Sequence, residues 1–187
     1  MLCNDDQWPP WYPWVPTTKG DARCRALADL HYTRVSVGHP QWTRPGYSAV
    51  LHAGPDSGGA LFVWWRPKWE DGRPGTSRKD GLRVLECTHF RRTPGCALPI
   101  SSTLIVCAEV ALFSKEVQSA LHLESAGTVE GLLTGVGSKQ TERGRGRSSP
   151  PGACFLHAGW VPFEKRPGRA DVWLWRPMPA VYIPERG

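Results

Sequence analysis

Residues 82–123 read LRVLECTHFRRTPGCALPISSTLIVCAEVALFSKEVQSALHL, and this segment decides the fold. Its first nine residues are rich in apolar, β-prone side chains and predict a strand. Pro94 and Gly95 end that strand and begin a loop. Beyond the loop, apolar residues recur at helical spacing, and either Ser101 or Ser102 can cap the helix that they form. The segment therefore predicts a strand, a loop and a long helix.

The loop between strand and helix has the pattern R-x-x-G-x-A, with Arg92, Gly95 and Ala97 at the fixed positions. A loop of this kind before a helix offers unpaired backbone N–H groups and the positive end of the helix dipole. Together these can bind a pyrophosphate. An ordinary connection between a strand and a helix is the alternative, because three fixed positions recur often by chance.

The composition is typical of a single globular domain. The chain has 187 residues, of which 40% are hydrophobic and 10 are tryptophan. Its six cysteines are scattered without C-x-x-C pairs, which argues against a zinc ribbon and for reduced thiols. The first residues contain no basic n-region and no apolar h-region, and no apolar run is long enough to span a bilayer. We therefore expect a cytoplasmic protein with no membrane partner.

The net charge of +6 favours a polyanionic partner such as nucleic acid or a phosphorylated cofactor. Basic side chains gather in the Gly-rich segment 137–151, GSKQTERGRGRSSPP. If this loop contacts phosphates, the residues that bind nucleic acid are Lys139, Arg143, Arg145 and Arg147. A solvated surface loop is the alternative for a stretch of like charges.

Residues 1–20 form a separate segment in which tryptophans alternate with prolines. Its prolines exclude a helix and disfavour a central strand. We expect an extended arm whose indoles pack onto the domain, with a stacking surface for exposed bases as the alternative. Residues 21–187 are predicted to form one domain.

Outside these segments, short helices and strands alternate along the chain. Asp21 can cap a short helix. Two apolar runs, Tyr47–Ala53 and Ala60–Arg66, flank a Gly/Pro/Asp turn and predict a β-hairpin. After the long helix we expect a strand, a short helix and two last strands, at residues 129–136, 152–159, 160–164 and 172–175. This order predicts an α+β fold.

Several short pieces of the sequence occur in an order that resembles a known family. They read HYTR, PGY, ALFVWWRP, LECTHFRR, SSTLI, LLTGV and PGACFLHAGW, at residues 31–34, 45–47, 60–67, 85–92, 101–105, 132–136 and 151–160. Together they resemble phage and prophage proteins with a GNAT-like acyltransferase fold, a group that includes the Mom-type DNA adenine-modification enzymes. The resemblance covers residues 20–177. Its most specific pieces are the His-Tyr dyad and the PG-x-C-[FY]-x-x-AGW block.

The resemblance implies a GNAT-like fold, in which a mixed, mostly antiparallel central sheet is flanked by helices. The cofactor would lie in the splay between the strands that flank the long helix. The implied activity is transfer of an acyl-derived group from acetyl-CoA, a small-molecule donor, to the exocyclic amine of adenine in DNA. An associated iron is also implied, and the setting would be a bacterial host cell.

The resemblance also implies roles for individual residues. His31 and Tyr32 would be the catalytic dyad, acting as acid and base groups or as metal ligands. The cofactor would be bound by the loop and by the residues around it, namely Arg91, Arg92, Gly95, Ala97, Ser101, Ser102 and Phe155. Two positions depart from the family pattern. Phe155 lacks the hydroxyl that could protonate a leaving thiolate, and Gly137 stands where a carboxylate is expected.

The proposed chemistry needs a general base, because the lone pair of the adenine amine is delocalised into its ring. An imidazole suits this role near neutral pH, so His31 is the candidate, with a hydrogen-bonded structural histidine as the alternative. His89 and His157 are expected to be structural. The target base would have to be flipped out of the duplex.

Two other functions stay open on the sequence. One is an N-acyltransferase that acts on a small amine or a protein. The other is a relative that binds nucleic acid without transferring an acetyl group, and the departures at Phe155 and Gly137 favour it. The sequence does not indicate the oligomeric state.

Overall fold

The computed structural model describes residues 13–31, 34, 36–56, 58–68, 82–126, 128–137, 149–164 and 172–178. The strands among them are β1 (Val15–Thr17), β2 (Tyr47–Ala53), β3 (Ala60–Arg66), β4 (Val84–Arg92), β5 (Gly131–Val136), β6 (Val161–Phe163) and β7 (Val172–Pro177). The helices are α1 (Ala22–Asp29), α2 (Ser101–Val110), α3 (Lys115–Leu121) and α5 (Ala153–His157), with 3-10 turns η2 (Ala111–Phe113) and η3 (Leu123–Ser125). In this described part, no helix has the length and apolar character that crossing a bilayer requires.

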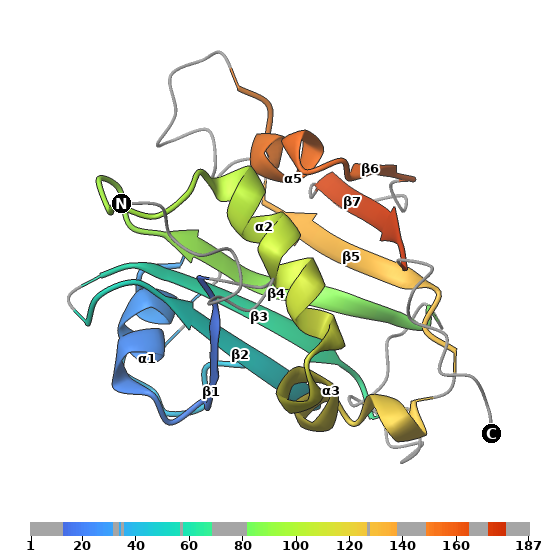
Figure 1. Ribbon diagram of the computed structural model, residues 1–187, viewed down its shortest axis with the longest axis horizontal. Helices are drawn as coiled ribbons and strands as arrows, with labels where there is room; N and C mark the ends of the chain where they lie inside the picture. The colour runs from blue at the N-terminus through green and yellow to red at the C-terminus, as the bar shows by residue number, and fades with distance from the viewer. Residues whose placement is uncertain are drawn as a thin grey trace, which may run out of the picture.

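The strands form one open seven-stranded sheet in the order β1-β2-β3-β4-β5-β7-β6 (Figure 1). Neighbouring strands are antiparallel except β4 and β5, which run parallel. A parallel pair needs a long crossover connection, and here α2 and α3 supply it. The predicted α+β class with a mixed, mostly antiparallel sheet is confirmed.

Two of the local predictions are confirmed in detail. The β-hairpin has the expected bounds, since β2 and β3 pair antiparallel along their full length. In its turn Gly59 has φ +99, and a Cβ there would lie 2.1 Å from the carbonyl oxygen of Ala53, so the turn requires glycine. Asp21 caps α1 as expected, because its side chain accepts a hydrogen bond from the backbone N–H of Arg23 at 2.9 Å.

Hydrophobic cores cover both faces of the sheet, because successive side chains of a strand point to opposite faces. On one face Phe62 and Leu85 pack with Leu104 of α2 in the larger core. Figure 1 shows α2 lying diagonally across the middle of the sheet. On the other face Leu27 of α1 packs with Leu61 of β3 in a smaller core.

The prediction of one long capped helix is wrong in two respects. The helix is interrupted, because α2 passes into η2 and Ser114 starts α3 by accepting a hydrogen bond from the N–H of Val117. A serine that bonds the backbone in this way favours a new helix start over continuation. At the other end Ile100 occupies the N-cap without a side-chain hydrogen bond, so Ser101 and Ser102 lie inside the first turn.

Part of the predicted N-terminal arm belongs to the sheet. β1 is an edge strand paired with β2, which is where a strand containing Pro16 can be accommodated. Trp14 is 2% exposed and donates its indole N–H to the carbonyl of Leu104 at 2.8 Å. Residues 1–12 lie outside the described residues, so an arm there stays a prediction.

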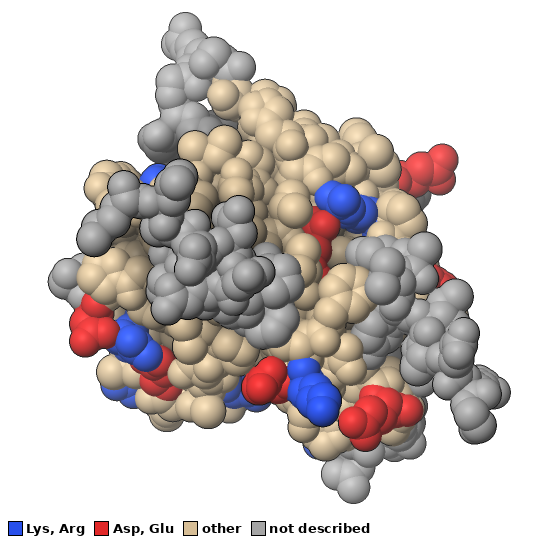
Figure 2. All heavy atoms as spheres, in the orientation of Figure 1, with Lys and Arg blue, Asp and Glu red and all other residues tan. Residues whose placement is uncertain are grey.

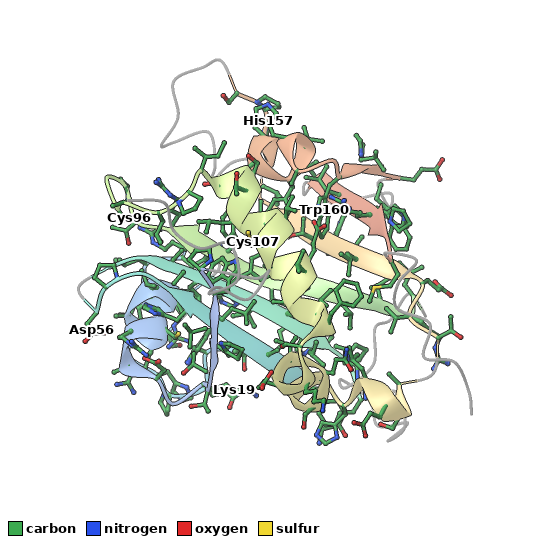
Figure 3. All side chains as sticks on the ribbon, viewed as in Figure 1. Lys19, Asp56, Cys96, Cys107, His157 and Trp160 are labelled. Atoms are coloured by element: carbon green, nitrogen blue, oxygen red, sulfur yellow. The ribbon has the colours of Figure 1, made fainter. Side chains whose placement is uncertain are left out.

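A buried carboxylate joins α2 to β7 and to the chain that follows α5. Glu109 accepts a hydrogen bond from the indole N–H of Trp160 at 2.6 Å and lies 3.2 Å from the guanidinium of Arg176 on β7. Burial raises the pKa of Glu109, while the two partners act in the opposite direction. Figure 3 shows Trp160 between α2 and β7, where this contact fixes the position of α5 and the chain that follows it.

Candidate active site

The parallel strands β4 and β5 separate, and a cavity lies where they part. Their pairing runs from Val84 and Gly131 to Cys87 and Thr134, whereas β4 continues to Arg92. Beyond Thr134, β5 stays paired with β7. The cavity has a volume of about 270 Å³ and is lined by residues from both faces of the sheet. An opening through the middle of a sheet is a place where a ligand can pass from one face to the other.

A β-bulge in β4 coincides with the point of separation. The pairing of β4 with β3 changes register between Val63–His89 and Trp64–Cys87, so Thr88 is the additional residue. A bulge bends its strand and leaves the ladder locally unpaired. Thr88 therefore lies at the end of the β4–β5 ladder and lines the cavity.

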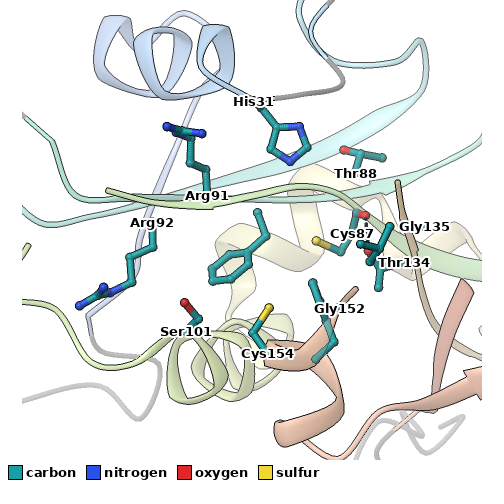
Figure 4. A pocket seen from close by; sticks show the side chains of 13 residues that line it. His31, Cys87, Thr88, Arg91, Arg92, Ser101, Thr134, Gly135, Gly152 and Cys154 are labelled. Atoms are coloured by element: carbon teal, nitrogen blue, oxygen red, sulfur yellow. Dashed lines mark hydrogen bonds between the residues drawn. The ribbon is translucent and has the colours of Figure 1, made fainter. Parts of the chain in front are cut away.

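Two buried histidines face each other on the α1 side of β4. The ring centroids of His31 and His89 are 5.0 Å apart, and the residues are 8% and 7% exposed. His31 follows the last turn of α1, and His89 belongs to β4. Figure 4 shows His31 on one side of β4, with Ser101 and Cys154 on the other side. His31 therefore marks the end of the cavity that is remote from α2.

Burial keeps both imidazoles neutral near pH 7. Desolvation lowers the pKa of His31 to about 3, and the charges of His89 and Arg91 act in the same direction. Desolvation, with Arg44 and Arg34, lowers the pKa of His89 to about 4. A neutral imidazole carries one N–H donor and one nitrogen acceptor, so each ring is a hydrogen-bonding group and a weak base in this position.

The opposite end of the cavity lies between the start of α2 and α5. Cys154 and Phe155 of α5 line it together with Ser101. Phe155 is 5% exposed, and its ring meets that of Phe90 edge to face at 5.9 Å. This end is therefore apolar and contains a thiol, and Phe155 brings no hydroxyl to it.

The loop predicted to bind the cofactor is held from within by Arg92. Its guanidinium donates to the backbone carbonyls of Cys96, Leu98 and Pro99 at 3.0, 2.9 and 3.0 Å. Arg92 thus fixes the loop that precedes α2, and most of its donors are used in doing so. Gly95 has φ +73 in this loop. Gly95 and Ala97 are exposed and do not line the cavity.

Donors for an anionic group are present at the start of α2 and on the α1 side of β4. Because α2 begins without a side-chain cap, the N–H groups of its first turn, around Ser101 and Ser102, are open to a ligand. Arg91 donates one hydrogen bond to the carbonyl of Leu30 at 2.7 Å. The Nε of Arg91 is buried without a partner among the described residues. This set of donors suits an elongated, anionic ligand that passes through the cavity.

The described residues do not fit a metal centre. No three His, Cys, Asp or Glu side chains among them converge to hold an ion. Tyr32 lies outside the described residues, so the predicted pairing of His31 with Tyr32, in catalysis or at iron, stays a prediction.

The predicted nucleic-acid contacts, Lys139, Arg143, Arg145 and Arg147, lie outside the described residues and also stay a prediction. Figure 2 shows that the described Lys and Arg side chains of one face are dispersed, and most of them lie next to Asp or Glu. No basic patch is therefore visible on the described surface in that view.

The sequence did not single out Thr88 or Cys154 as site residues. The sequence of β4 contains a sign of the bulge at Thr88. Leu85, Cys87 and Phe90 all pack in the larger core, and their spacing departs from the alternation that a regular strand requires. Such a break is what a bulge produces. Cys154 had no comparable signal, since its place in the cavity depends on how α5 packs against α2.

Comparisons of the chain with protein-family models, curated proteins and solved structures find no match.

Proposed function

We propose that this protein is an acetyl-CoA-dependent acyltransferase with a GNAT-like fold that acts on the exocyclic amine of adenine in DNA. The observation that carries the proposal is the cavity between β4 and β5, because GNAT-type enzymes hold coenzyme A in a splay of this kind. The order of elements along the chain and the sequence pieces from His31 to Trp160 support the same reading.

The cavity residues would hold the donor along its length. The first turn of α2 would bind the pyrophosphate through backbone N–H groups. The pantetheine arm would pass Cys154 and Phe155, which exclude water. Bound acetyl-CoA supplies a thioester, which is an acyl group activated toward an amine.

His31 would accept the proton of the attacking amine. The carbon–nitrogen bond forms as the carbon–sulfur bond breaks, and the proton lost by the amine finally resides on the departing thiolate. His31 lines the cavity where it reaches the α1 face, so it can take that proton in transit. Burial lowers its pKa to about 3, which makes it a weaker base than an ordinary imidazole, so it would pass the proton on to the thiolate rather than hold it.

The choice of adenine in DNA rests on the sequence resemblance and on the net charge of +6. A base within a duplex is inaccessible, so the enzyme would have to flip it out. A small amine or a lysine side chain would need no such step. Mass spectrometry distinguishes these acceptors directly.

The experiment measures binding and chemistry separately. Acetyl-CoA should raise the melting temperature of the protein, and deoxyadenosine from treated duplex DNA should carry an additional acyl mass. His31→Ala should keep the thermal stabilisation by acetyl-CoA and reduce the modification by about 10²-fold, the usual effect of a positioned proton-transfer group. Acylation of a small amine or of a protein without modified deoxyadenosine would overturn the DNA assignment.

A pair of substitutions on α5 tests the cavity itself. Cys154→Phe places a ring in the cavity, whereas His157→Phe adds a ring to an exposed position of the same helix. Figure 3 shows His157 pointing away from the sheet. Stabilisation by acetyl-CoA should be lost in Cys154→Phe and retained in His157→Phe. Equal stabilisation of both variants would refute the assignment of the cavity.

A further inference from the structure

A second cavity begins where the first one ends. It has a volume of about 460 Å³ and is lined by Thr88 and His89 together with the loop that runs from Arg34 to Arg44. Thr88 lines both cavities. The pair formed by His31 and His89 therefore lies between them, with His31 facing the first cavity and His89 facing the second.

The wall of the second cavity is fixed by internal contacts. Arg34 forms an ion pair with Asp29 at 2.6 Å and donates to the carbonyl of His39 at 2.6 Å. Trp42 is 5% exposed, and its ring meets that of His89 edge to face at 5.6 Å. Because these groups already have partners within the protein, they give the cavity its shape rather than bind a ligand.

Other polar groups in this wall lack partners. Thr43 is 4% exposed, and its hydroxyl has no hydrogen-bond partner among the described residues. A buried hydroxyl of this kind is costly unless a ligand or water satisfies it. Gln41 uses its amide N–H on the carbonyl of Thr43 at 2.8 Å, which leaves the side-chain oxygen as an acceptor. The residues that line this cavity therefore include an unpartnered hydroxyl and an amide oxygen.

Arg44 adds a cationic group at the edge of the cavity. One of its nitrogens lies 2.7 Å from Glu86, and the Arg44 side chain is 55% exposed. A guanidinium has further donors that match the oxygens of a phosphate. The positive charges of Arg34 and Arg44 also repel a cationic acceptor such as a lysine side chain. Asp29 and Glu86 offset part of that charge.

We propose that this second cavity is the acceptor pocket and that it receives one unstacked nucleotide. The inference rests on the proposed acyltransferase function. Arg44 contacts the phosphate, and Thr43 and Gln41 hydrogen-bond the edge of the base. The exocyclic amine then lies at the histidine pair, where the two cavities meet. The volume falls within the range of about 300–1,000 Å³ that is typical of small-molecule pockets.

The test uses deoxyadenosine 5′-monophosphate as the probe and isothermal titration calorimetry as the measurement. Thr43→Val removes the hydroxyl at nearly constant volume and should weaken binding of the probe by about 5- to 10-fold. Thr43→Tyr fills the cavity and should abolish binding. Ser48→Ala is the matched control, because Ser48 has another buried hydroxyl without a partner and does not line this cavity. Deoxyadenosine, which lacks the phosphate, should bind the wild type more weakly than the probe does.

Each outcome decides the proposal. Loss of probe binding in both Thr43 variants but not in Ser48→Ala supports it. Unchanged binding in both Thr43 variants, or no binding by the wild type, overturns it. Stabilisation by acetyl-CoA is the independent readout for the proposed function. If the wild type binds the probe through Thr43 but acetyl-CoA has no effect, the nucleotide pocket stands and acyl transfer fails. If acetyl-CoA stabilises every variant and Thr43 is irrelevant to the probe, the donor site stands and the pocket assignment fails.

Discussion

The two buried histidines should make the stability of the protein fall steeply in mild acid. An unfolded histidine has a pKa near 6.5, whereas the folded values are about 3 for His31 and about 4 for His89. At a pH between the folded and the unfolded pKa, the unfolded chain binds a proton that the folded chain excludes. The contribution of each neutral histidine to the free energy of unfolding is therefore complete above the unfolded pKa and is lost as the pH falls toward the folded pKa. Each histidine should lower the free energy of unfolding by about 1.4 kcal/mol per pH unit in this window.

From pH 6.5 to about pH 5 this amounts to about 2 kcal/mol for each histidine, or about 4 kcal/mol for the pair. Urea denaturation at several pH values in this range gives the slope. Carboxylates with ordinary pKa values titrate at lower pH, but Glu109, whose pKa is raised by burial, and His52, whose pKa is lowered by burial, also contribute to the wild-type slope, so the effect of the pair is read from the difference between the wild type and each variant. His31→Gln and His89→Gln should each remove about half of the effect of the pair. His157→Gln, the control, removes an exposed histidine. A flat profile for the wild type, or an unaltered slope in His31→Gln, would refute the reasoning.

Two further substitutions test groups that support the site. In Arg92→Lys the positive charge is kept, but the lysine cannot bond three carbonyls at once. The free energy of unfolding should fall by about 1–2 kcal/mol, and the stabilisation by acetyl-CoA should become smaller. Wild-type values for the unfolding free energy and for the stabilisation by acetyl-CoA would show that the loop does not depend on Arg92. Glu109→Ala leaves Trp160 and Arg176 without their acceptor and should cost about 3–5 kcal/mol in a urea titration. Glu109→Gln keeps one acceptor oxygen and should cost less; the reverse order would contradict the contact.

The sequence predicted those elements whose local signals agree with their packing. The bounds of β2 and β3 were correct because apolar runs flank a turn that requires Gly59. The prediction that Asp21 caps α1 was also correct, because the capping hydrogen bond forms between residues two positions apart in the chain. The long helix failed because apolar spacing continues past Ser114, and only the hydrogen bond from Val117 to the Ser114 side chain shows that the helix restarts there.

The site was less predictable because its residues come together only through the sheet. A motif predicts a role for His31, and the structure places this residue at one end of a cavity and against His89. The structural role that the sequence predicts for His89 stays a prediction. The loop from Arg34 to Arg44 gave no signal, because its polar groups form a pocket only when folded against β4.

The bulge at Thr88 explains why an opening exists at the centre of this sheet. Before it, β4 has neighbours on both sides. Beyond it, β4 pairs only with β3 among the described strands, so one row of its backbone N–H and C=O groups has no strand partner there. Such groups need hydrogen-bond partners, and an unpaired edge accepts an extended chain that carries amides. The pantetheine arm of coenzyme A is an extended chain with two amides. The feature that interrupts the ladder is therefore also the feature that gives the proposed donor its backbone partners.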